Sequence, residues 1–204
     1  MLRQQKLVLN PIFSPAVAPE IIKRLEYHYQ VLVYNSTGKP PQDFEFFKEK
    51  IKGITKWLTE ISCTKKNLLI QGGAGIGKST LANAMKLMFA ESSYRFYKFS
   101  ISSKELGDIY RNREDCESWE KLNNKSCKIL FIDDLGMEED ITNDYGSKIQ
   151  PMILLLHTRY ENGTTTIITT NLSTEALREK YDDRIADRLN SYCKLLYNTR
   201  SYRK

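Results

Sequence analysis

The stretch "GGAGIGKST", residues 72–80, constrains the fold of this chain more than any other feature. Gly72, Gly77, Lys78 and Ser79 fit the pattern G-x-x-x-x-G-K-[ST], between an apolar strand-like run, "LLIQ", and a helical pattern. Loops of this kind turn backbone N–H groups toward phosphates at the positive end of the following helix. We therefore predict a nucleoside triphosphate site whose binding residues are Gly72, Gly73, Ala74, Gly75, Ile76, Gly77, Lys78, Ser79 and Thr80.

Two further strand-like runs end in polar side chains that suit the same chemistry. "KILFIDDLG" (128–136) ends in Asp133 and Asp134, and "TIITT" is followed by Asn171. Ends of this kind meet at the ligand edge of a parallel sheet. We expect Lys78 to reach the β- and γ-phosphates, and Asp133 to hold Mg²⁺ with the Ser79 hydroxyl. Asp134 is expected to polarise an attacking water, and Asn171 to orient that water or sense the phosphate.

Short apolar runs alternate with helical patterns along most of the chain, which is typical of a parallel sheet with helices on both faces. The predicted strands are 67–71, 94–101, 128–133, 165–170 and 193–199. The predicted helices among them are 78–90, 103–112, 146–160 and 181–189. This order predicts an α/β protein.

The first part of the chain has a different pattern. Apolar residues at helical spacing predict a helix over 18–33, and "NSTGKPPQ" (35–42) then breaks any regular element. A second helix is expected from Asp43, which suits an N-cap. We therefore predict a small N-terminal helical appendage with a linker over residues 1–42, and a single core domain over residues 43–204.

Composition adds weaker constraints. The chain is 41% hydrophobic and 27% charged, as in ordinary globular proteins. No window reaches the roughly 18 consecutive apolar residues of a membrane helix, and the first residues lack the apolar core of a secretory signal. We therefore expect a cytoplasmic protein with no membrane partner. The net charge of +6 favours polyanionic partners without identifying one.

Six motifs occur in an order that resembles one known family. They are "GGAGIGKST", "LFIDDLG", "LLLHTRY", "TIITTNLS", "DDRIADRL" and the final "SYR", spread over residues 65–204. Together they resemble the DnaC/IstB group of AAA+ ATPases, which contains bacterial helicase loaders and transposition helper proteins. The resemblance implies a P-loop NTPase of AAA+ type with a five-stranded parallel sheet. In it Asp133 and Asp134 look like the Walker B pair, and Asn171 looks like sensor 1.

The same resemblance implies residues that act between subunits. "DDRIADRL" looks like the segment of the arginine finger, with Arg188 the first choice and Arg184 the second. Arg203 is similar to the sensor 2 arginine that contacts nucleotide. This mapping implies assembly into a ring or spiral and weak turnover by a lone subunit. Surface salt bridges with the neighbouring aspartates of the segment remain the alternative for Arg184 and Arg188.

Family kinship also implies single-stranded DNA as a partner. The residues expected near DNA follow the second predicted strand and are Ser102, Ser103, Lys104, Arg111 and Arg113. The alternating aromatic and basic residues of 94–101 are more typical of a core strand. The basic end, Arg200, Arg203 and Lys204, is a further candidate for phosphate contact. His28 and His157 are expected to be packed rather than catalytic.

The favoured function is therefore an ATP- and Mg²⁺-dependent ATPase that assembles on single-stranded DNA and loads a replicative helicase. A transposition helper with a transposase as partner is the nearest alternative. A small-molecule or nucleotide kinase is a rival from another class, and it would need a lid with phosphate-clamping arginines and an acceptor pocket. The family motifs argue against it. A nucleotide-gated adaptor with negligible turnover also stays open, because Asp134 is shorter than the glutamate common in AAA+ proteins.

Overall fold

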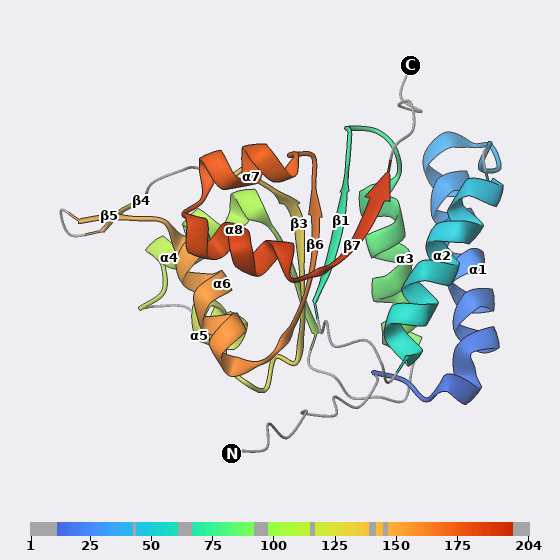
Figure 1. Cartoon of the computed structure of the whole chain (residues 1–204), viewed down its shortest axis with the longest axis horizontal. Helices are drawn as coiled ribbons and strands as arrows, with labels where there is room; N and C mark the ends of the chain where they lie inside the picture. The colour runs from blue at the N-terminus through green and yellow to red at the C-terminus, as the bar shows by residue number, and fades with distance from the viewer. Residues whose placement is uncertain are drawn as a thin grey trace, which may run out of the picture. The chain divides into compact units, whose positions relative to one another are not determined.

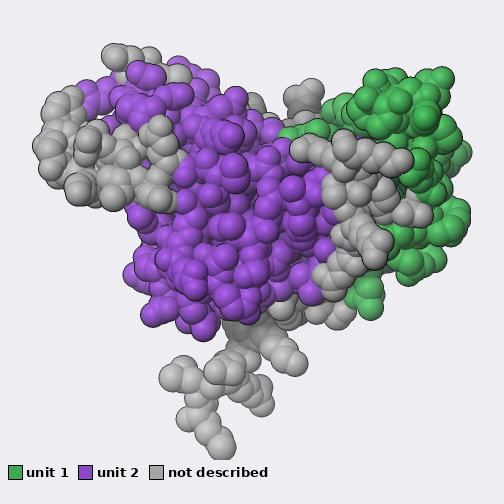
Figure 2. Space-filling view, turned by 90° about the horizontal axis from the view of Figure 1, so that it is seen from above, with its two compact units in different colours: residues 1–65, 83–91 green, residues 66–82, 92–204 purple. Residues whose placement is uncertain are grey.

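The chain forms two compact units in a computed structural model, which describes residues 12–42, 44–60, 67–91, 98–114, 117–138, 142–144 and 147–197. The first unit comprises Met1–Lys65 and Asn83–Glu91, and the second comprises Lys66–Ala82 and Ser92–Lys204 (Figure 2). Helix α3 (Lys78–Glu91) therefore contributes its first residues to the second unit and the rest to the first. The predicted domain boundary after residue 42 stays a prediction.

A five-stranded parallel sheet forms the centre of the second unit (Figure 1). Its strand order is β2-β3-β6-β1-β7, so β1, the first strand in sequence, lies between the last two, β6 and β7. The strands are β1 (Leu68–Gly72), β2 (Lys98–Ser102), β3 (Ile129–Leu135), β6 (Thr165–Thr170) and β7 (Cys193–Tyr197). This arrangement confirms the predicted five-stranded parallel sheet.

The central strands are buried because both faces of the sheet are covered. Leu69, Leu130 and Ile168 belong to one buried cluster, into which helices α4 to α8 also project side chains. Alternate residues of the same strands, such as Ile70 and Phe131, are buried as well. The helices of the cluster are α4 (Leu106–Arg111), α5 (Ser118–Asn123), α6 (Pro151–Asn162), α7 (Thr174–Lys180) and α8 (Asp183–Asn190).

The prediction of a helix over 146–160 is wrong at its start. Strands β4 (Thr142–Asp144) and β5 (Ser147–Ile149) form an antiparallel pair there, and α6 begins only at Pro151. The ring of a proline disfavours helical backbone in the preceding residue, and Gln150 is accordingly extended. Proline itself suits the first turn of a helix, because its missing N–H would have no partner there.

Other helix limits follow from local capping. The predicted helix 103–112 is a 3₁₀ turn, η2 (Ser103–Glu105), followed by α4. Helix α8 begins later than the predicted residue 181 because the Asp182 carboxylate accepts a hydrogen bond from the Ile185 N–H at 2.7 Å. Helices α5 and α7 were not expected, because six or seven residues are too few to show a helical repeat in the sequence. Of the predicted strand 94–101, residues 94–97 lie outside the described residues.

The first unit contains η1 (Pro15–Val17), α1 (Ala18–Thr37), α2 (Phe44–Thr59) and residues 83–91 of α3. Helix α1 is longer than the predicted 18–33 and ends at Gly38, whose left-handed backbone (φ 68°) caps it. The Tyr29 and Phe47 rings join α1 to α2, with centroids 4.2 Å apart. The predicted N-cap of the second helix, Asp43, lies outside the described residues.

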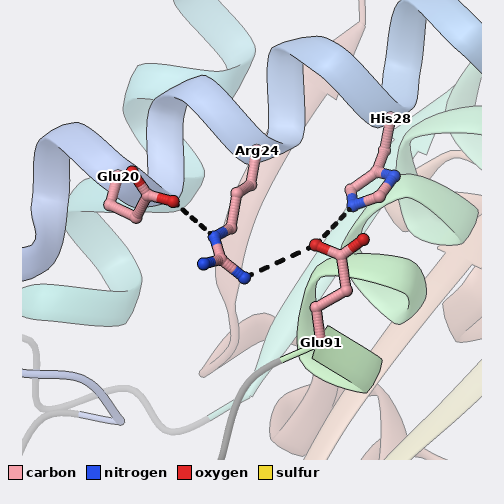
Figure 3. A network of polar contacts seen from close by, with 4 residues as sticks. All are labelled: Glu20, Arg24, His28 and Glu91. Carbon is pink, nitrogen blue, oxygen red and sulfur yellow. Dashed lines mark hydrogen bonds and ion pairs between the residues drawn. The ribbon is translucent and has the colours of Figure 1, made fainter.

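A polar network also joins α1 to the end of α3 within the first unit (Figure 3). Arg24 bonds Glu20 at 2.6 Å and Glu91 at 3.4 Å. The Nε2 atom of His28 lies 3.1 Å from the same Glu91 carboxylate, without the alignment of a hydrogen bond. Since the Arg24 and Glu91 side chains are 39% and 47% exposed, solvent screening keeps this network a minor source of stability.

Among the described residues, no helix combines the length and the apolar character that a bilayer crossing requires.

Arg159 is the largest fully buried side chain among the described residues of the second unit (1% exposed). Its guanidinium donates to the carbonyls of Leu122 (2.9 Å), Cys127 (3.2 Å) and Thr165 (2.7 Å) and to the Thr166 hydroxyl (2.9 Å). These acceptors lie on α5, on the segment before β3 and on β6. One side chain on α6 therefore fixes three neighbouring elements.

We expect Arg159→Leu to lower the free energy of unfolding by about 3 kcal/mol, because it leaves several buried acceptors without a donor. Urea denaturation of the full chain measures this loss. Arg178→Leu is the matched control, since the one contact that Arg178 makes with the described residues is an exposed ion pair with Asp187 (3.6 Å). It should change stability by less than about 0.5 kcal/mol. Equal losses in the two variants would contradict the structural role of Arg159.

Candidate functional site

The carboxyl ends of three adjacent strands meet at one edge of the sheet. Strand β6 lies between β3 and β1, and its last residue, Thr170, pairs with Leu135 of β3 and Gln71 of β1. Polar groups placed after such strands lie at the ligand edge of an open α/β sheet. The pairing therefore brings the glycine-rich loop, the two aspartates and Asn171 to the same place.

The glycine-rich loop passes from β1 into α3 by way of residues that need to be small. A Cβ atom on Gly72 would lie 2.6 Å from the Tyr197 Cβ and 2.7 Å from its carbonyl oxygen, on neighbouring β7. Gly75 and Gly77 have φ angles of 76° and 89°, which glycine adopts without strain. Helix α3 begins at Lys78, so the loop lies at the positive end of that helix.

Lys78 is buried (4% exposed) and points back into the loop. Its Nζ donates to the Gly73 carbonyl and to Oδ1 of Asn171, both at 2.6 Å. The structure thus joins two predicted site residues that are 93 positions apart in sequence. An ammonium group held by neutral oxygens beside a loop of N–H donors suits the binding of a phosphate.

Asp133 lies close to the start of α3. Its Oδ1 accepts hydrogen bonds from the Ser79 hydroxyl (3.0 Å) and from the Thr169 hydroxyl. Carboxylate and hydroxyl oxygens are ligands that Mg²⁺ prefers, and Mg²⁺ in proteins is held by few protein groups besides phosphate and water. Ser79 and Asp133 therefore have the chemistry expected of a magnesium site.

A β-bulge orients the two aspartates differently. Along the pairing of β3 with β6, Ile132 pairs with Ile168 and Leu135 with Thr170, so β3 has one extra residue. Asp134 lies in this bulge and has a φ of 56°, a left-handed backbone that aspartate tolerates better than most residues. Its N–H donates to Thr169 Oγ1 (2.9 Å), and its carbonyl accepts from Ser103 Oγ (2.6 Å).

Thr169 and Ser103 are site residues that the sequence analysis missed. The Thr169 hydroxyl bonds both Asp133 and the Asp134 backbone, although its sequence context suggests only a buried strand. Ser103 was expected near DNA, which is wrong, because its side chain is fully buried against the bulge. For Thr169 the available signal was a hydroxyl within an apolar run, since a buried hydroxyl needs a polar partner. The sequence around Ser103 has no such signal.

Arg188 on α8 is held by two side chains of α6. Its Nη1 contacts Nδ1 of His157, and its guanidinium carbon lies 4.2 Å from the centroid of the Tyr160 ring. Arg184 is exposed. Within the described part of the chain, neither Arg184 nor Arg188 forms an ion pair, or any hydrogen bond to the glycine-rich loop. The salt bridges considered for them are therefore absent there, and Arg203 lies outside the described residues.

The environment of His157 disfavours its charged form. Burial, and after it the positive charges of Arg188 and Arg184, lowers the pKa of His157 below its ordinary value of 6.5. The imidazole is therefore neutral at pH 7, and its Nδ1 atom accepts from the guanidinium.

Comparison with known proteins identifies the kind of domain that this site belongs to. A family model described as "IstB-like ATP binding protein" matches residues 42–204. No curated protein sequence matches the chain.

The fold is shared with solved structures of replication proteins. The chain is similar to DnaI (17% identity, TM-score 0.56, covering 96% of this chain and 97% of that one). It is also similar to the DnaC helicase loader (22% identity, TM-score 0.50, covering 65% of this chain and 78% of that one). A third similar structure is AMPPCP-bound DnaA from Aquifex aeolicus (14% identity, TM-score 0.55, covering 78% of this chain and 47% of that one). At these identities the likeness concerns the fold.

We expect Thr169→Val to lower the free energy of unfolding by about 1–3 kcal/mol, because the Asp134 N–H and a lone pair of Asp133 lose their partner. Thr169→Ser keeps the hydroxyl and should recover most of the loss. Thr165→Val is the matched control on the same strand, since no described residue bonds the Thr165 hydroxyl. Urea denaturation distinguishes the three, and a Thr165 effect as large as that of Thr169 would contradict the assignment.

Proposed function

Because this chain belongs to the IstB-like ATP-binding protein family, we propose that it is a Mg²⁺-dependent ATPase that assembles on single-stranded DNA and loads a replicative helicase. The observation that carries the ATPase proposal is the convergence of Lys78, Ser79, Asp133 and Asn171 at one sheet edge. Lys78 and Ser79 begin α3, Asp133 lies on β3, and Asn171 follows β6. The proposal places the protein in the cytoplasm, where ATP and DNA are both accessible.

Each residue has a separate task in this proposal. Lys78 exchanges its bond to the Gly73 carbonyl for the β- and γ-phosphates, since a phosphate is the stronger acceptor for an ammonium. Ser79 and Asp133 would hold Mg²⁺, which would neutralise charge on the phosphates. Asp134 polarises the attacking water from its bulged position. Asn171 bonds Lys78 through Oδ1, which leaves its amide N–H₂ to bond water or phosphate.

Turnover in this proposal depends on assembly. Arg188 is the first choice for an arginine that reaches the nucleotide of a neighbouring subunit, and Arg184 is the second. Arg203 is proposed to contact the nucleotide within its own subunit. An arginine supplied in trans stabilises charge that develops in the transition state, so a lone subunit should turn over slowly. Self-association into a ring or spiral is therefore part of the proposal.

Two alternatives are kept because specific observations favour them. An ATP-dependent transposition helper would have the same core, and the matching family is the one named for IstB. A nucleotide-gated adaptor with negligible turnover is favoured by the short Asp134 side chain. Helicase loading is preferred because the DnaC helicase loader has the same fold.

Nucleotide hydrolysis is the first prediction of this proposal. Steady-state ATP hydrolysis per subunit should rise with protein concentration and with single-stranded DNA, because both promote assembly. Lys78→Ala should weaken ATP binding at least about tenfold, or by about 1.4 kcal/mol. Asp134→Asn should leave ATP bound and lower kcat sharply, because the water loses its base. Lys128→Ala, an exposed lysine at the opposite edge of the sheet, is the control.

The alternatives predict other outcomes of the same assay. Tight ATP binding with a flat rate near zero, unchanged by Asp134→Asn, would support the adaptor. Transfer of phosphate to an acceptor other than water would contradict the ATPase proposal. Loss of hydrolysis in the Lys128→Ala control would show that the assay reports general damage rather than the site.

Single-stranded DNA binding is the second prediction. Of the residues expected near DNA, Arg111 contacts Asp108, and Arg113 bonds the Tyr110 carbonyl at 3.1 Å and stacks on its ring. Lys104 is exposed at the carboxyl edge of the sheet. We expect Lys104→Ala to weaken binding and to reduce the slope of log K against log salt by about one. Fluorescence anisotropy measures both, and an unchanged slope in Lys104→Ala with a reduced one in Lys128→Ala would contradict the prediction.

A further inference from the structure

We propose that His157 and Tyr160 form a cradle that positions Arg188, and that only the neutral imidazole holds it. The role of this arginine cradle rests on the proposed function, in which Arg188 acts on a neighbouring subunit. In that scheme His157 is a positioning residue rather than a catalytic one. The cradle also makes the position of Arg188 dependent on pH.

The geometry of the cradle carries the inference. His157 and Tyr160 are three residues apart on α6 and so lie on the same side of the helix. Arg188 comes from the last turn of α8, with Nη1 against His157 Nδ1 and its guanidinium carbon 4.2 Å from the Tyr160 ring centroid. A guanidinium only donates hydrogen bonds, so Nδ1 must be the unprotonated nitrogen of the ring.

Both helices that form the contact are firmly anchored. Arg159 lies between the two cradle residues in sequence, and its buried bonds fix α6 to the neighbouring elements. Helix α8 packs through Ile185 and Leu189, which are 0% and 2% exposed. Since neither helix has much freedom, the side-chain contacts decide where the Arg188 guanidinium lies.

The cradle holds Arg188 without a carboxylate. Asp187 pairs with Arg178 at 3.6 Å, and Asp182 is used as the N-cap of α8. Within the described residues Arg188 therefore keeps its full positive charge, with an imidazole nitrogen and an aromatic face as partners. An arginine neutralised by a carboxylate would have to break that pair before it could stabilise charge on a phosphate.

Protonation of His157 would dismantle the cradle. The charged groups around it are Arg184, Arg188 and Asp182 from α8, and Glu161 from its own helix. Burial and the two arginines together outweigh the carboxylates and lower the His157 pKa. The contact is therefore present above that lowered pKa and is lost as the pH falls through it. Below it, an imidazolium would face a guanidinium with no acceptor between them.

The first test measures the contact without ATP. An NMR titration of the imidazole protons is tractable because the chain has two histidines, and His28→Asn identifies their signals. In the full chain the His157 pKa should lie below 6.5, and Arg188→Ala should raise it. Arg178→Ala is the control and should leave it unchanged. An unchanged His157 pKa in Arg188→Ala would overturn the cradle.

The second test asks whether the contact positions Arg188 for hydrolysis. His157→Asn keeps an acceptor near the place of Nδ1 and cannot be protonated. This variant should keep the unmodified chain's kcat at pH 7.5. At acid pH its kcat should fall less than that of the unmodified chain, because its contact with Arg188 does not depend on protonation. His157→Leu has no acceptor and should lower kcat several-fold with KM unchanged. In the Arg188→Ala background His157→Leu should have no further effect.

The failures of the two proposals are distinguishable. If Lys78-dependent hydrolysis is present and Arg188→Ala lowers it, but His157→Leu leaves it unchanged, the cradle is overturned and the ATPase stands. Equal losses from His157→Leu in both backgrounds would also overturn it, because they would indicate general damage to folding. Absence of any Lys78-dependent hydrolysis would overturn the proposed function, and with it the positioning role.

Discussion

The parallel pairing of β1, β6 and β3 is the constraint on which the site depends. Parallel strands place all their carboxyl ends at one edge, so segments from distant parts of the sequence meet there without any loop having to span the sheet. The β-bulge between Ile132 and Leu135 then adds one residue at that edge. Thr169 stabilises the bulge by bonding Asp133 and the Asp134 backbone, so sheet register and aspartate orientation are linked.

Three buried or half-buried cations of this protein share one physical feature. Lys78, Arg159 and Arg188 each donate hydrogen bonds to uncharged acceptors. For Arg159, which is enclosed by carbonyls and a hydroxyl, this arrangement fixes structure. For Lys78 and Arg188, a neutral partner is easier to exchange for a phosphate than a carboxylate would be. The same chemistry thus contributes to rigidity at Arg159 and, in the proposed function, to phosphate binding at Lys78 and Arg188.

Much of the site could be predicted from sequence because its motifs are local. The glycine-rich loop, Asp133 and Asn171 each follow a short apolar run, and parallel-sheet geometry is enough to bring such ends together. The helix before β6 was placed too early because apolar periodicity does not mark where a helix begins, whereas Pro151 does. Thr169 and Ser103 were missed because the partner of a buried hydroxyl depends on sheet register.

By itself, the sequence determined the parallel α/β fold and the nucleotide loop, since both depend on short-range patterns of residue type. Tertiary structure alone decided which groups share a hydrogen bond: Lys78 with Asn171, Thr169 with both aspartates, and Arg188 with His157. These pairs are separated by 31 to 93 positions along the chain. Contacts over such distances depend on strand order and helix packing, which spacing along the chain does not encode.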